Sequence, residues 1–249
     1  MPTPQSKRKF ASLPTLLLLV VAICAGCGPR PPPIVAPVGG FPPDFPTAFY
    51  GAQRPEDVYR ISPAQSSLRL KVYRAGALAS LGHSHIIDSR SIDGFIHLAD
   101  DFTAARADLF VPVASFIVDD ATARSEAGPD FATQPTADDI EGTRANMLGP
   151  KLLDAARFPF IVVHVAPMRV SPHSTQVKLS IRLRDHVAEV PVDVVWRRNG
   201  AELATQASFQ IDHSTLNLPP FSAVGGLLRV APQIDITVTL VAVATTTPR

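Results

Sequence analysis

The chain has 249 residues, of which 46% are hydrophobic and 18% charged, so it can bury one sizeable core and is predicted to form a single folded domain. Its 23 basic and 22 acidic side chains leave a formal net charge of +1, which excludes a long-range attraction to nucleic acid or to anionic lipid. Cys24 and Cys27 are its only cysteines, so no disulfide is expected beyond residue 27.

Residues 1–26 have the pattern of a bacterial lipoprotein signal peptide. The basic residues Lys7–Lys9 precede a mostly apolar stretch, 10–23, that is too short to span a bilayer comfortably. The sequence Cys24-Ala25-Gly26-Cys27 resembles a lipobox, which implies cleavage before Cys27 and a lipid anchor on its thiol. Because Gly and not Asp follows Cys27, the chain resembles lipoproteins held on the periplasmic face of the outer membrane. The alternative is an ordinary secretory signal in which Cys27 is incidental.

The next segment, 27–57, is rich in proline and includes the run Pro31-Pro32-Pro33. Such sequences favour extended polyproline II, so this segment is predicted to be a tether between the anchor and the domain. The folded domain is expected over residues 58–244, and residues 245–249 are expected to form a disordered tail.

Alternation of apolar and polar residues dominates the domain and predicts half-buried strands. The clearest case has Leu68, Leu70 and Val72 on one face and Arg69 and Lys71 on the other. About eight strands are predicted from such runs, at 68–72, 92–98, 107–118, 160–165, 177–183, 190–196, 203–211 and 234–240. Between the runs 190–196 and 203–211, Asn199-Gly200 predicts a hairpin with a type I′ turn, in which both central residues have positive φ.

One stretch, Thr136 to Asp154, breaks the strand pattern. Thr136 is a candidate N-cap, and Asp138 and Asp139 in the first turn favour a helix. Gly149-Pro150 interrupts the pattern, so a broken helical insertion is expected, with a second short turn through Leu153.

The predicted fold class is mostly β: an eight-stranded antiparallel, lipocalin-like barrel with a short helical insertion. Sequential strands with alternating faces must close or stack to hide their edges, and up-and-down connectivity favours closure. A barrel of eight strands has an interior wide enough for one small or slender ligand.

Several segments resemble the YceI-like, polyisoprenoid-binding family. The resemblance lies in the opening segment 59–67, the junction 152–159, the hairpin segments 179–182 and 190–192, and the closing segments 209–214 and 234–241. It implies a lipocalin-like barrel in the periplasm that holds an isoprenoid-like or quinone-type lipid in an elongated apolar cavity, and it brings no catalytic residue. The chain departs from the family pattern at 82–87 and in a longer insertion at 127–139, both expected near the opening of the barrel.

Apolar residues on the hydrophobic faces of the strands are the candidate ligand contacts. They are Leu70, Val72, Val192, Val194, Trp196, Phe209 and Val238. Periodicity alone leaves open whether they line a cavity or fill a core.

Four polar residues are further candidates for the ligand site. His83 and His85 flank Ser84, and on a strand their imidazoles point to one face, where they could share a metal ion given further ligands, or hydrogen-bond near the barrel opening. Arg144 and Asn146, on the expected helix, could bind a polar head group; the alternative for Arg144 is a surface salt bridge with Asp139 or Glu141.

The leading hypothesis is therefore a lipid-anchored binding protein with an apolar ligand. No Gly-x-Ser-x-Gly elbow occurs and no cysteine lies in the domain, so neither an enzyme nor a cofactor is predicted. The other hypotheses are a metal- or haem-linked periplasmic site at His83 and His85, and a purely structural envelope protein whose barrel is filled. The sequence leaves the oligomeric state open.

Overall fold

The computed structural model describes residues 40–98, 104–170 and 174–245, and every structural statement below refers to these residues. The predicted signal peptide, the predicted anchor residue Cys27, the first part of the predicted tether and most of the predicted tail lie outside them. None of the helices in the described segments is long and apolar enough to cross a bilayer.

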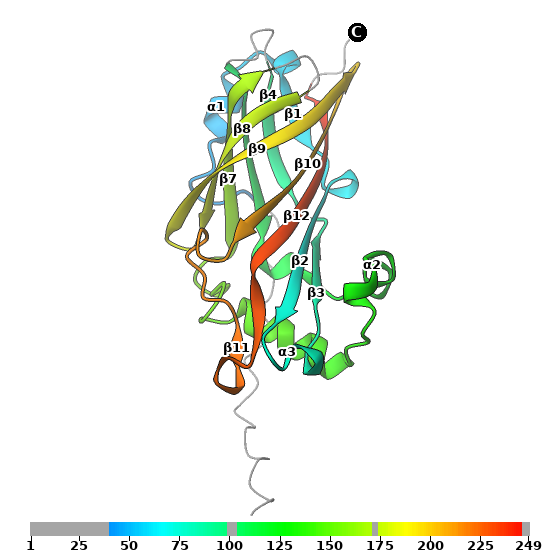
Figure 1. Ribbon diagram of the computed structural model, residues 1–249. Coiled ribbons are helices and arrows are strands. Elements are labelled where there is room, and N and C mark those ends of the chain that lie inside the picture. The colour runs from blue at the N-terminus through cyan, green and yellow to red at the C-terminus, as the bar shows by residue number, and fades with distance from the viewer. Residues whose placement is uncertain (1–39, 99–103, 171–173, 246–249) are drawn as a thin grey trace, which may run out of the picture. The chain divides into compact units, whose positions relative to one another are not determined.

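The predicted eight-stranded barrel is confirmed. Its wall is formed by β1 (Val58–Ile61), β4 (Asp93–His97), β5 (Arg106–Pro112), β7 (Phe160–Val170), β8 (Ser174–Leu183), β9 (His186–Asn199), β10 (Glu202–Asp212) and β12 (Leu228–Ala244). Each strand is antiparallel to the next in that order, and β12 closes the ring on β1 through pairs such as Tyr59 with Ala244 (Figure 1). Closure leaves these strands with no free edge.

A second, smaller set of strands extends the wall beyond the closed ring. β12 is long enough to pair with β1 at its end and with β2 (Ser67–Ala75) along its first part, and β3 (His85–Ser89) and β6 (Ile117–Val118) follow β2. The short 3₁₀ turn η2 (Pro63–Gln65) separates β1 from β2. β1 and β2 are therefore two consecutive strands that pair with different parts of the same long strand, β12.

The hairpin between β9 and β10 is confirmed, but its predicted turn type is wrong. Asn199 pairs with Glu202, so the central residues of the turn are Gly200 and Ala201. Gly200 has a φ of 58°, whereas neither Asn199 nor Ala201 has positive φ. These signs are those of a type II′ turn, which requires glycine only at its first central position.

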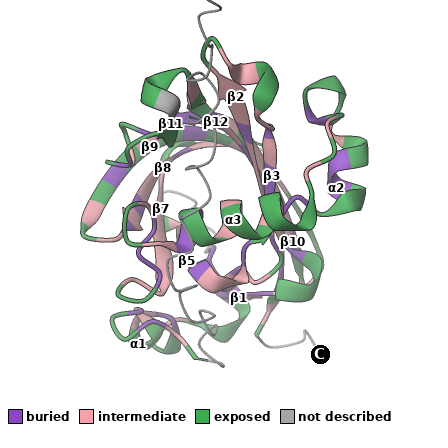
Figure 2. Cartoon of the chain, turned by 90° about the horizontal axis from the view of Figure 1, so that it is seen from below, coloured by how far each residue is buried: buried purple, intermediate pink, exposed green. Residues whose placement is uncertain are grey.

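The helical insertion forms as predicted. α3 (Ala137–Leu148) begins at Thr136, whose side chain accepts from the N–H of Asp139 while Asp139 accepts from the N–H of Thr136. The helix ends at Gly149, and hydrogen-bonded turns follow as far as Leu153. α3 lies at the end of the barrel that is lowest in Figure 1 and is seen from below in Figure 2, and its Met147 and Leu148 pack into the barrel core.

The predicted tether needs correction over residues 40–57, because this part of the chain folds against the barrel. Phe45 and Tyr50 are buried, and Tyr50 lies in the short helix α1 (Thr47–Gly51) that precedes the first strand. The ring of Phe41 stacks on Phe95 at 5.5 Å and meets Phe110 edge-on at 5.6 Å. We call residues 41–54 the N-terminal arm. Its aromatic side chains cover apolar surface, which outweighs the preference of proline for an extended chain.

Candidate binding cavity

The interior of the barrel is hollow. Inward-facing residues such as Val194, Ala207 and Phe209 alternate with exposed ones but are themselves only partly buried, as expected of side chains that border an open space. They surround a cavity of about 290 Å³. This volume lies at the lower end of the range for ligand pockets in proteins. The hypothesis of a filled, purely structural barrel is therefore not supported.

The wall of the cavity is almost entirely apolar. Among the described residues that line it, only Arg106, Thr175 and Thr205 lack an apolar side chain. Thr175 is already engaged, because the indole N–H of Trp196 donates to its hydroxyl at 3.2 Å. Such a cavity offers a ligand dispersion contacts and very few hydrogen bonds, so it suits a hydrocarbon better than a polar molecule.

Most of the predicted apolar candidates border this space. The lining includes Leu70, Val192, Val194, Trp196, Phe209 and Val238. Val72 does not line it; it is buried in the same core cluster as Ile87 and pairs with His85 on β3. Sequence reasoning missed Leu153, Leu216 and Leu218, which also line the cavity but lie in turns, where no period of two marks the inward face.

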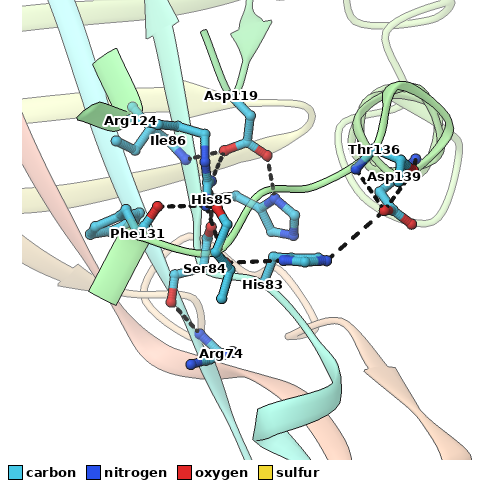
Figure 3. Close-up of polar contacts among 11 residues, drawn as sticks. Arg74, His83, Ser84, His85, Ile86, Asp119, Arg124, Phe131, Thr136 and Asp139 are labelled. Carbon is cyan, nitrogen blue, oxygen red and sulfur yellow. Dashed lines mark hydrogen bonds and ion pairs between the residues drawn. The ribbon is translucent and has the colours of Figure 1, made fainter. Parts of the chain in front are cut away.

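The predicted histidines lie outside the cavity, in a polar cluster near the N-terminus of α3 (Figure 3). His85 Nδ1 lies 2.7 Å from Asp119 Oδ2, and His83 Nδ1 lies 3.0 Å from the hydroxyl of Thr133. His83 Nε2 faces Asp139 of α3 at 3.9 Å. The two imidazoles therefore bind different segments of the chain, and their ring centroids lie 6.4 Å apart.

Asp119 and Arg124 form the centre of this cluster. The Asp119 carboxylate has no exposed surface and accepts from Arg124 Nη1 at 2.5 Å, from the N–H of Ile86 at 2.9 Å and from His85. Arg124 also donates to the backbone oxygens of Ser84, Phe131 and Thr133. Burial raises the pKa of Asp119, but the hydrogen bonds from His85 and Ile86 and the nearby charges outweigh it, so the net pKa is lowered. The carboxylate stays charged and ties β3, the segment before α2 (Ala121–Glu126) and the loop at 131–133 together.

The hypothesis of a metal site finds no support in this geometry. Among the described residues, no group of three or more His, Cys, Asp or Glu side chains is arranged to hold a metal ion. A site with only two imidazoles lacks the third or fourth ligand that zinc requires.

The two polar candidates on α3 are also absent from the cavity lining. Arg144 Nη2 donates to the backbone oxygen of Ala114 at 3.1 Å, and Asn146 is exposed. The structure thus shows neither the head-group contact nor a salt bridge from Arg144 to Asp139 or Glu141. The reason is that α3 lies beside β6, which brings the guanidinium to the turn that precedes that strand.

A further polar centre was missed by the sequence analysis. Asp108 on the outer face of β5 accepts from the hydroxyl of Tyr50 at 2.6 Å, from Arg106 Nε at 2.7 Å and from His164 Nδ1 at 2.9 Å. Burial raises its pKa, but these hydrogen bonds outweigh that effect, and the net pKa is lowered. The sequence signal that this segment packs against the domain, and so brings Tyr50 to Asp108, was its aromatic residues Phe41, Phe45 and Phe49, because so many rings are unusual in a solvated tether.

The fold and the hollow apolar interior define a closed antiparallel barrel of the lipocalin type, a class built to enclose small molecules. Within that class the chain belongs to the YceI-like family, because it matches the YceI-like domain over residues 59–242. No curated protein matches it.

Two solved structures show the extent of the similarity. BcnA of Burkholderia cenocepacia is 15% identical, with a TM-score of 0.53 over 73% of this chain and 98% of BcnA. The YCEI protein of Campylobacter jejuni is 8% identical, with a TM-score of 0.45 over 63% of this chain and 83% of that protein. At such identities the likeness to BcnA concerns the fold alone.

Proposed function

We propose that the protein binds an isoprenoid-like or other slender apolar molecule, such as a quinone-type lipid, inside its barrel. The observation that carries this proposal is the cavity of about 290 Å³ with its nearly unbroken apolar wall. Transfer of a hydrocarbon chain from water into such a space gains about 0.8 kcal/mol for each buried CH₂ group. A charged head group would find almost no partner there, so it would lie outside the cavity.

We further propose that the protein acts as a lipoprotein in the periplasm, attached to the membrane through Cys27. The basic, apolar and small-residue pattern of residues 1–27 supports this part. It is tested by labelling cells with a radioactive fatty acid: the protein with Cys27 should incorporate label and the Cys27→Ser variant should not. Equal labelling of both proteins, or of neither, would contradict the anchor.

The ligand proposal is tested with Trp196, the only tryptophan of the chain, which lines the cavity. A bound quinone should quench its fluorescence, and a polyprenol should compete for the same space. The test variant is Ala207→Phe, which places a ring into the cavity from β10. The control is Ser208→Phe, because Ser208 is the next residue on the same strand and faces solvent.

The protein and Ser208→Phe should take up the quinone with similar affinity, whereas Ala207→Phe should bind about tenfold or more weakly, because its ring occupies the volume that the ligand needs. Absence of quenching and of polyprenol competition in the unmodified protein would refute the proposal. Equal binding by the two variants would place any ligand outside the barrel.

A further inference from the structure

Two loops meet at the end of the barrel that carries α3 and form what we call the apolar tip. Its first segment, 74–82, follows from β2 into the 3₁₀ turn η3 (Ala79–Leu81); its second, 219–230, contains β11 (Ser222–Ala223) and the start of β12 (Figure 1). The N–H of Leu78 donates to the oxygen of Leu227 at 2.9 Å. At Gly76 a Cβ would lie only 2.4 Å from that same oxygen, so glycine permits this close contact.

The tip exposes large apolar side chains. Leu81 is 73% exposed, Leu227 48% and Phe221 46%. A single exposed apolar residue needs no explanation, but three of them on two joined loops form a patch of the kind that marks an interaction site.

Charge at the tip has one sign only. Residues 74–82 and 219–230 contain no Asp or Glu, and their only charged residues are Arg74 and Arg229. Arg74 Nη1 is held by the oxygen of Gly82 at 2.7 Å, and Arg229 is exposed. Arginines beside exposed apolar groups match a surface that is apolar inside and anionic outside.

The tip is continuous with the cavity wall. Leu216 and Leu218 line the cavity, and Phe221 is only three residues further along the chain. A contact made by the tip therefore acts on the same stretch of chain that borders the proposed ligand.

We propose that the apolar tip inserts into the surface of an anionic lipid bilayer, where the protein takes up or releases its ligand. This rests on the proposed function and adds the place where the ligand enters. The apolar side chains would enter the boundary between head groups and acyl chains, while Arg74 and Arg229 contact lipid phosphates. A second copy of the chain is the weaker candidate for an occupant, because symmetric tip-to-tip contact would bring four arginines together without a carboxylate from either tip.

The experiment is co-flotation of the mature polypeptide, residues 28–249 without its lipid, with vesicles of phosphatidylethanolamine and phosphatidylglycerol. The test variant is Leu81→Ser with Leu227→Ser. The matched control is Val187→Ser with Val195→Ser, because these valines are 54% and 61% exposed but lie on the barrel wall in β9. Thermal unfolding and quenching of Trp196 by quinone are measured on all three proteins.

The unmodified protein and the control should float with the vesicles, whereas the tip variant should bind about tenfold or more weakly, because two leucines no longer enter the bilayer. Binding should weaken at high salt and on vesicles of neutral phosphatidylcholine. Quinone uptake and the thermal midpoint should be the same in all three proteins.

Failure of the unmodified protein to float, or equal flotation of the tip variant and the control, would overturn the proposal. If flotation fails but quinone uptake persists, the proposed function stands and only the docking site is refuted. If the protein binds vesicles but takes up no quinone, the proposed function is refuted and the tip remains a membrane-binding surface. A concentration-dependent dimer that the tip variant alone abolishes would assign the surface to a second copy of the chain and would also overturn it.

Discussion

Replacing Tyr50 by Phe should loosen the N-terminal arm from the barrel. The change keeps the ring, which stacks on Phe95 at 5.0 Å, and removes only the hydroxyl that donates to Asp108 at 2.6 Å. The Asp108 side chain is 5% exposed, so water cannot readily replace the lost donor. A hydrogen bond to a charged group contributes about 1.5–3 kcal/mol, and for a domain of this size each kcal/mol lowers the thermal midpoint by about 2–4 °C. We therefore expect Tyr50→Phe to lower the midpoint by about 3–12 °C.

The assay is thermal and urea unfolding of Tyr50→Phe beside a matched control, Tyr73→Phe. Tyr73 donates to Asp235 at 2.7 Å, and burial with this hydrogen bond raises its pKa to about 12, but Asp235 is less buried than Asp108, so water can replace the lost donor there. The control should lose about 1 kcal/mol or less. A loss in Tyr50→Phe that is no larger than in Tyr73→Phe would refute the inference that the arm is part of the folded domain.

Three further predictions concern buried groups. Arg124→Leu should cost about 3–5 kcal/mol in urea unfolding, because it leaves the buried Asp119 carboxylate without its cation; a loss below 1 kcal/mol would contradict this. Gly94→Ala should lower the free energy of unfolding by more than about 2 kcal/mol, because Gly94 has a φ of 147° and a Cβ would lie 2.1 Å from the backbone oxygen of Asp108; an unchanged urea midpoint would contradict that packing. Because the folded-state pKa of Asp108 is lowered, its carboxylate stabilises the fold above about pH 4 and loses that effect as the pH falls through the folded-state pKa. The free energy of unfolding should thus fall less steeply below pH 4 in Asp108→Asn than in the unmodified protein.

The barrel could be predicted because its information is local and repetitive. Along β9, exposed residues such as Glu189 and Asp193 alternate with inward residues such as Val192 and Val194, and β10 keeps the same period of two over residues 205–211. The helix α3 was equally visible, because its capping box lies within four residues of sequence. The turn type at Gly200 was not, because the register of the two strands decides which residues occupy the turn.

The partners of the arm could not be predicted, because they lie far along the chain. Phe95 and Phe110 are outward-facing residues of strands, and nothing near residue 41 indicates that they will be left for Phe41 and Phe45 to cover. Proline content gave a local preference for an extended chain, and burial of aromatic rings overrode it.

The histidine cluster shows the same limitation in the candidate site. His83 and His85 alone resembled a pair of metal ligands, but their roles depend on Asp119, Thr133 and Asp139, which are more than 30 residues away. Asp119 adopts a φ of 55°, which places it beside the buried guanidinium of Arg124. Hydrogen bonds to one nitrogen of an imidazole fix the direction of the other nitrogen, which is the one that could bind a metal ion. In His83 this other nitrogen, Nε2, faces Asp139 of α3 at 3.9 Å.

Whether a barrel of eight strands is hollow depends on side-chain volume, which periodicity does not report. Along β10 the inward residues are Leu203, Thr205, Ala207, Phe209 and Ile211, so the smallest ones occupy the middle of the strand. The largest inward side chain, Trp196, pairs with Thr205 and is tied to Thr175, which holds its indole against the wall. Small residues in the middle and a restrained tryptophan leave space that no neighbouring side chain fills. A larger residue in place of Ala207 would fill part of this space and gain dispersion energy, so the small size of Ala207 supports the proposal that the barrel holds a ligand.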